Sequence, residues 1–169
     1  MTPAPEFFQH LFEYTRWADL RQLETTTPLA DEAYFKNHGW SFGTIHKVML
    51  HMLSAQSIWL DRIVGRTPVW LADDSRMAER AAVEPEWHAI HQRFTAFLAE
   101  QTSQSLDAGI THTNMRGQTF TLPLWNLLTH VCNHSTHHRG QLNSMIKLSG
   151  GEPSEIDYSI YIKIAKGLM

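Results

Sequence analysis

The chain has 169 residues, of which 43% are apolar and 18% charged, a balance typical of a single globular domain spanning residues 1–169. Its net charge is −3 with neutral histidines and no run of lysine or arginine occurs, which argues against a broad basic surface for nucleic acid. The chain has one cysteine, Cys132, and therefore no internal disulfide. Neither a signal-peptide pattern nor an apolar run of about 18 residues occurs. We therefore expect a cytoplasmic protein without membrane contact.

Apolar residues recur at helical spacing in four long segments, which predicts helices over residues 5–26, 41–65, 84–105 and 123–148. Ser41 is a candidate cap for the second of these helices, and Pro123 suits the first turn of the fourth. A loop that contains Asp73 and Asp74 is expected between the second and the third.

The segment 109–122 has a different composition, because β-branched residues flank an expected turn at Met115-Arg116-Gly117. This pattern predicts a short β-hairpin before the last long helix. The tail, residues 154–169, is amphipathic enough for a short strand or helix packed on the body. Four helices of about 20 residues with one hairpin predict an all-α protein whose architecture is a four-helix bundle.

Four of the eleven histidines fall within nine residues, at His130, His134, His137 and His138. On a helix with about 100° per residue, His138 lies at the centre of the apolar stripe and His134 at its edge. His130 and His137 fall on the flank, while Cys132 points nearly the opposite way. Two inward imidazoles four residues apart need a metal ion or hydrogen-bonding partners, such as each other or buried water, and we favour the metal.

A third ligand has to come from another helix, and His51 is the candidate because it lies in the middle of the second helix, beside apolar residues. His46 lies in the first turn of that helix, where an exposed side chain is expected. His88 and His91 on the third helix form a competing pair, although the polar residues around them indicate a solvated surface. Three further histidines lack a partner at helical spacing and are expected on the surface or in loops: His10, His38 and His112.

Ligating imidazoles usually donate their second N–H to an oxygen. Four side chains are candidates for such partners, with an ordinary exposed residue as the alternative for each: Glu13, Asp19, Asp61 and Gln141. Trp17 and Trp59 are candidates to line a pocket at the site, with plain core packing as their alternative.

The run His134-Ser135-Thr136-His137-His138-Arg139-Gly140-Gln141 resembles the C-terminal signature of the DinB/YfiT-like metalloenzymes. Residues 41–65, with His51 and Ile58-Trp59-Leu60, resemble the second helix of that family. Residues 14–19 resemble its first-helix signature, except that Asp19 stands where many relatives carry asparagine, and residues 150–158 resemble its tail.

This resemblance implies a four-helix bundle that binds a divalent ion through His51, His134 and His138, with zinc or nickel favoured and iron or manganese as alternatives. It also implies a homodimer and a small-molecule substrate, because the family resembles thiol-dependent enzymes such as bacillithiol transferases and the mycothiol-dependent maleylpyruvate isomerase.

Three neutral histidines leave at least one coordination position open, which is typical of a reactive site and not of a closed structural one. Two enzymatic hypotheses follow: attack of a metal-bound low-molecular-weight thiol on an electrophile, and hydrolysis by activated water. The resemblance favours the thiol-dependent transferase or isomerase. A metal-binding or stress-related protein without catalysis is the third hypothesis, and the sequence identifies no general base.

Overall fold

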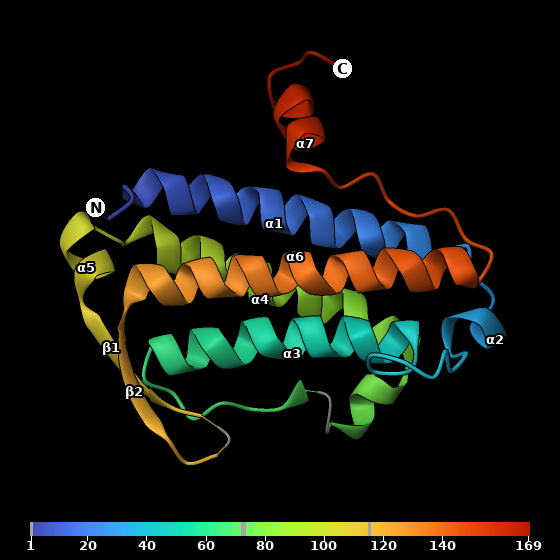
Figure 1. Ribbon diagram of the computed structural model, residues 1–169, viewed down its shortest axis with the longest axis horizontal. Helices are drawn as coiled ribbons and strands as arrows, with labels where there is room; N and C mark the ends of the chain where they lie inside the picture. The colour runs from blue at the N-terminus through green and yellow to red at the C-terminus, as the bar shows by residue number, and fades with distance from the viewer. Residues whose placement is uncertain (1, 72–73, 115) are drawn as a thin grey trace.

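The computed structural model describes residues 2–71, 74–114 and 116–169, and four long helices dominate it (Figure 1). These helices are α1 (Pro5–Thr26), α3 (Ile45–Ile63), α4 (Val83–Ala99) and α6 (Leu124–Leu148). Helix α6 packs against both α1 and α3, and α4 packs against the same two helices, so that the four surround one apolar core. The predicted four-helix bundle is confirmed.

Helix α6 is buried over a wider arc than one apolar stripe, because two neighbouring helices cover it. The residues of the predicted stripe are buried, and so is a second face. Cys132, which helical phase directed away from the core, is only 4% exposed and lies close to Thr15 of α1. The expectation for Cys132 was therefore wrong, since helical phase identifies one buried face and says nothing of a second neighbour.

Two helix ends differ from the prediction because local hydrogen bonds fix them elsewhere. Helix α3 begins after Thr44, whose side-chain oxygen accepts a hydrogen bond from the Lys47 backbone N–H at 3.1 Å, so Ser41 is not its cap. Helix α4 ends at Ala99, where the prediction continued to residue 105. Thr102 and Ser105 cap each other's backbone N–H groups there and start a separate short helix, α5 (Ser103–Asp107).

The predicted hairpin is confirmed as β1 (Gly109–Thr113) and β2 (Thr119–Pro123), which pair antiparallel with Gly109 opposite Pro123 and Thr113 opposite Thr119. Met115 of the predicted turn and Asp73 of the predicted loop lie outside the described residues.

The tail forms helix α7 (Tyr158–Ala165), which stands away from the bundle and contacts α1 through aromatic rings (Figure 1). Besides α5, three further short elements in the described part of the chain were not predicted: helix α2 (Asp31–Tyr34) and the 3-10 turns Ser75–Ala78 and Arg80–Ala82. In the described part of the chain, no helix is long and apolar enough to cross a membrane.

Candidate metal centre

Three histidine side chains converge between α3 and α6. His51 comes from the middle of α3, and His134 and His138 come from α6, one turn apart. The Nε2 atom of His51 lies 3.2 Å from Nε2 of His134 and 3.2 Å from Nε2 of His138, and the last two atoms are 3.1 Å apart. The structure thus brings together the three side chains that the sequence predicts as ligands.

The spacing of these three nitrogens fits one divalent ion. Zinc binds imidazole nitrogen at 2.0–2.1 Å, and a tetrahedral arrangement then places neighbouring nitrogens about 3.3 Å apart. Burial lowers the pKa of His51 to about 4, and His138 adds to this effect. Burial also lowers the pKa of His134 to about 3, together with the surrounding histidines. Both imidazoles are therefore neutral at pH 7 and have lone pairs to donate.

Gln141 orients the third imidazole. The Nδ1 atom of His138 lies 2.8 Å from Oε1 of Gln141, and because this oxygen only accepts, Nδ1 carries the proton. The Nε2 atom of His138 consequently presents its lone pair to the other two histidines. Oε1 of Gln141 also accepts a hydrogen bond from the Ser41 hydroxyl at 2.8 Å. Gln141 is therefore the predicted oxygen partner that contacts a ligand.

A tight turn before α3 covers the centre. Ser41 has φ of 53°, in the left-handed region that a non-glycine residue rarely adopts, and Gly43 has φ of 89°. Between them, the ring of Phe42 stacks on His51 with a centroid distance of 4.0 Å and an interplanar angle of 21°. Phe42 shields one face of this imidazole from water. The sequence placed Phe42 inside the predicted helix 41–65, and its covering position arises only because the helix begins later, at Ile45.

The other predicted oxygen partners lie elsewhere. Asp61 pairs with Arg93 on α4, and Glu13 is exposed on α1. Asp19 accepts a hydrogen bond from Arg139 at 2.9 Å in the interior of the bundle. Trp59 lines a cleft together with His134 and also packs against the apolar core, so both alternatives offered for it hold.

Trp17 does not lie at the site, since its ring packs against Tyr14 and Tyr161. Neither of the predicted pocket tryptophans belongs to the buried part of the core.

Asp19 belongs to a buried polar cluster next to the centre. Besides Arg139, it accepts a hydrogen bond from Gln56 Nε2 at 2.7 Å and lies 3.4 Å from Nε2 of His91. Burial alone would raise the pKa of Asp19, but the Arg139 charge and the contacts with His91 and Gln56 outweigh it and leave the pKa below its usual value. The carboxylate is therefore charged at neutral pH.

Three histidines expected on the surface are buried. His46 is 6% exposed, its Nε2 donates to the Met77 carbonyl at 2.8 Å, and the turn Ser75–Ala78 that covers it was not predicted. His91 turns inward to Asp19, so that it and the exposed His88 do not share a face. His112 is buried by the Trp59 ring. None of these imidazoles belongs to the cluster of three.

Two cavities meet at His51. The larger, about 760 Å³, lies between Phe42, Trp70 and the start of α3. The smaller, about 290 Å³, shares His51 and Trp70 with the first and is also lined by His134. Small molecules therefore have room in two cavities beside the three histidines.

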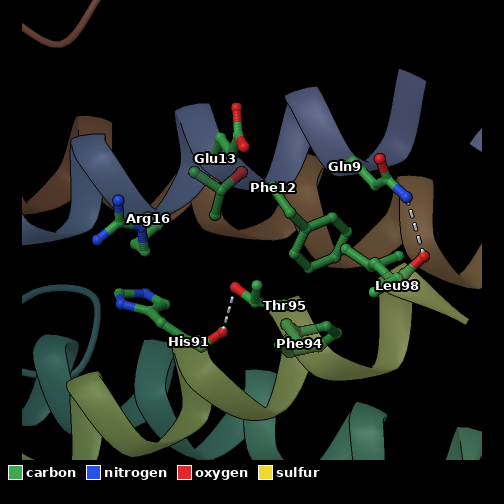
Figure 2. Close-up of a pocket in the computed structure, with 10 residues that line it drawn as sticks. Gln9, Phe12, Glu13, Arg16, His91, Phe94, Thr95 and Leu98 are labelled. Atoms are coloured by element: carbon green, nitrogen blue, oxygen red, sulfur yellow. Dashed lines mark hydrogen bonds between the residues drawn. The ribbon is translucent and has the colours of Figure 1, made fainter. Parts of the chain in front are cut away.

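A third cavity, of about 190 Å³, is separate from the centre. It lies between α1 and α4, and the aromatic rings of Phe12 and Phe94 flank it alongside Arg16 and His91 (Figure 2). No residue of the three-histidine cluster lines it.

The sequence matches the DinB family over residues 3–168. It is 26% identical over 171 residues to Protein DinB of Bacillus subtilis (strain 168), with 95% of this chain and 96% of that protein covered. The fold is similar to the crystal structure of a DinB-like protein from Bacillus cereus ATCC 10987, with a TM-score of 0.72 and 19% identity, covering 91% of this chain and 98% of the other. The three-histidine cluster and this relationship fit a metal-binding protein. Because the family match extends over almost the whole sequence, the chain belongs to the DinB family.

Proposed function

We propose that this protein is a divalent-metal-dependent enzyme that uses a low-molecular-weight thiol in a transfer or isomerisation reaction on a small molecule. The observation that carries the proposal is the convergence of the Nε2 atoms of His51, His134 and His138 beside two cavities that His51 lines. Three imidazole donors suit zinc or nickel, and iron or manganese are the alternatives. The open side of such a donor set would face the cavities, where a substrate has access.

A divalent ion in this position would supply positive charge that favours the thiolate form of a bound thiol. The protein's own groups prepare the site for it. Burial keeps His51 and His134 neutral at pH 7, so no proton has to leave before they bind. Gln141 fixes the tautomer and direction of His138, and Phe42 excludes water from one face of His51.

The thiol has to come from outside the chain. Cys132 is the only cysteine, and it is 4% exposed on the face of α6 that packs against α1. Burial raises the pKa of its thiol to about 12, so that the thiol stays protonated and unreactive at neutral pH. A separate small thiol is therefore the proposed partner.

Two cavities favour a reaction between two molecules. A thiol and its electrophile each need space beside the centre, and the cavities of about 760 and 290 Å³, both lined by His51, offer it. A hydrolase needs space for one organic substrate, because water is its second reactant. Transfer is therefore proposed ahead of hydrolysis.

Metal analysis of the purified protein tests the site. We expect one equivalent of metal in the wild type, its loss in His138→Ala and its retention in His88→Ala. His88 is the matched control because it lies exposed on α4 near Glu84, outside the cluster. Equal metal content in both variants would contradict the ligand assignment.

Depletion of an electrophile tests catalysis. We expect the metal-loaded protein to consume an activated aryl halide only when a small thiol such as cysteine is present. Consumption of an ester without thiol would instead favour a hydrolase. Metal binding without turnover of either compound would favour a non-catalytic role.

The proposed homodimer has its own test. Light scattering of the metal-loaded protein should give about twice the monomer mass of 19.4 kDa, and a monomer mass would contradict self-association.

A further inference from the structure

The smaller cavity beside the proposed metal centre is a basic cleft formed by separate parts of the chain. His51, Trp59 and Arg62 come from α3 and His134 from α6. Trp70 comes from the segment after α3, and Arg116 from the turn of the hairpin. We call this volume of about 290 Å³ the arginine cleft. Two guanidinium groups and two of the three clustered histidines therefore share one small space.

Arg62 keeps its charge in the cleft without a carboxylate partner among the described residues. Its guanidinium lies over the Trp59 ring, 5.1 Å from the centroid, and its partial burial lowers its pKa. Arginine stays charged in proteins despite such a shift. Two other arginines on the helices of the bundle do have such a partner, since Arg93 pairs with Asp61 and Arg139 with Asp19. A partly desolvated cation that lacks a counter-ion favours binding of an anion.

Arg116 reaches the same cleft from the hairpin turn. Its backbone N–H donates to Oδ1 of Asn114 at 2.9 Å, and the same oxygen accepts from the Gln118 N–H at 3.0 Å. Gly117 completes the turn with φ of 75°, a conformation that residues with a side chain rarely adopt. No ion pair of Arg116 occurs in the described structure. The turn therefore fixes the backbone of Arg116, whose guanidinium is the second one at the cleft without a carboxylate partner in the described part of the chain.

The lining of the arginine cleft is one-sided in charge. No acidic side chain occurs among its described lining residues, whereas the larger cavity at His51 is lined by both Lys47 and Asp74. This contrast is informative because the whole chain carries a net charge of −3. The lining therefore favours a ligand with negative charge over an uncharged one.

We propose that Arg62 and Arg116 bind a carboxylate of a small molecule in the arginine cleft, so that the reacting partner on this side of the centre is an anionic acid. The inference rests on the metal-dependent function proposed above. A planar guanidinium forms two parallel hydrogen bonds with a carboxylate, which orients as well as binds the molecule. The indoles of Trp59 and Trp70 provide apolar surface for its carbon chain.

Binding of succinate and of its uncharged analogue succinamide tests the anion site without any reaction. Each compound is titrated into the metal-loaded protein while the indole N–H signals of Trp59 and Trp70 are followed by NMR. We expect succinate to bind at least about tenfold more tightly than succinamide. Arg62→Gln combined with Arg116→Gln should remove this preference, and Arg62→Lys should retain part of it.

Arg66→Gln is the matched control, because Arg66 is exposed just beyond α3 and does not line the arginine cleft. It should bind succinate like the wild type. Equal binding of succinate and succinamide, or unchanged succinate binding in the double variant, would overturn the inference. Tighter binding of inorganic phosphate than of succinate would overturn its assignment to a carboxylate.

Metal content of the same samples separates this inference from the proposed function. The double variant should hold as much metal as the wild type, since neither arginine belongs to the histidine cluster. Wild-type protein that holds metal but shows no succinate preference would refute the anion site alone. Wild-type protein that binds succinate through both arginines but takes up no metal would refute the metal-dependent function and support the anion site.

Discussion

Arg139 and Asp19 form an ion pair in the middle of the bundle, with 2.9 Å between Nη1 and Oδ1 and exposed fractions of 1% and 2%. The pair joins α6 to α1. Arg139 directly follows His138, so the ion pair fixes the rotation of α6 at the turn that carries one of the proposed ligands. The two residues are 120 positions apart in the sequence, and packing of α6 against α1 brings them together.

Replacing Asp19 by asparagine should destabilise the fold strongly. The change removes the charge that neutralises Arg139 in the interior, and breaking a buried ion pair from one side costs about 3–5 kcal/mol. Urea unfolding measures the difference. Asp31→Asn is the control, since Asp31 is exposed and lies 3.4 Å from Arg80, and an exposed pair contributes about 0–1 kcal/mol. Equal losses in both variants would contradict the role of the buried pair.

The pH dependence of the unfolding free energy should show the titration of the Asp19 carboxylate. The pKa of Asp19 is lower in the folded protein than its usual value, so its stabilising contribution is present above the pKa of the unfolded chain and is lost as pH falls through the folded value. The gap in unfolding free energy between wild type and Asp19→Asn should therefore shrink below about pH 4. A gap that stays constant between about pH 6 and pH 3 would show that Asp19 does not titrate as described.

Gln141→Ala should weaken metal binding without removing a ligand. His138 then loses the oxygen that holds its Nδ1–H, and loss of such a partner typically costs 10–100-fold in metal affinity. Competition with a chromogenic chelator measures the affinity. Gln141→Glu keeps an acceptor and should restore most of it, and the exposed Asn133→Ala on the same helix should have no effect. Wild-type affinity in Gln141→Ala would contradict the positioning role.

Cys132 should be inert in the folded protein. Its thiol is buried and protonated, so an aromatic disulfide reagent should modify the native protein at least about 100-fold more slowly than the urea-unfolded chain. Cys132→Ala should leave thiol-dependent turnover unchanged. Loss of turnover in a folded Cys132→Ala protein would show that the chain supplies its own thiol.

Helical phase was sufficient to select the clustered histidines because α3 and α6 are regular where they face each other. The same rule puts His134 and His138 on one face and leaves His130 and His137 on the flank, where the structure has them exposed. The hairpin was equally readable, because its strands have β-branched residues on both sides of a turn. These features depend on residues close together in the chain.

The errors concern burial by distant segments. His46 becomes buried because residues 75–78, about 30 positions away, fold over the start of α3, and periodicity within α3 contains no information about them. Cys132 is buried for a similar reason, since α6 contacts two helices. The roles of two residues depend in the same way on segments that connect helices. Arg62 lines a cleft because the hairpin turn and the segment after α3 close it, and Phe42 covers His51 because the turn before α3 directs it there.

The clustered histidines come from α3 and α6 alone, whereas Phe42, Trp70 and Arg116 reach the cavities from segments between helices. Connecting segments tolerate changes in sequence and length better than the packed helices that they join. Exchange of these segments would therefore change which molecule reaches the centre while the three Nε2 atoms stay in place. A single metal-binding framework would thereby gain new substrates by loop exchange, as antibody domains gain new antigens.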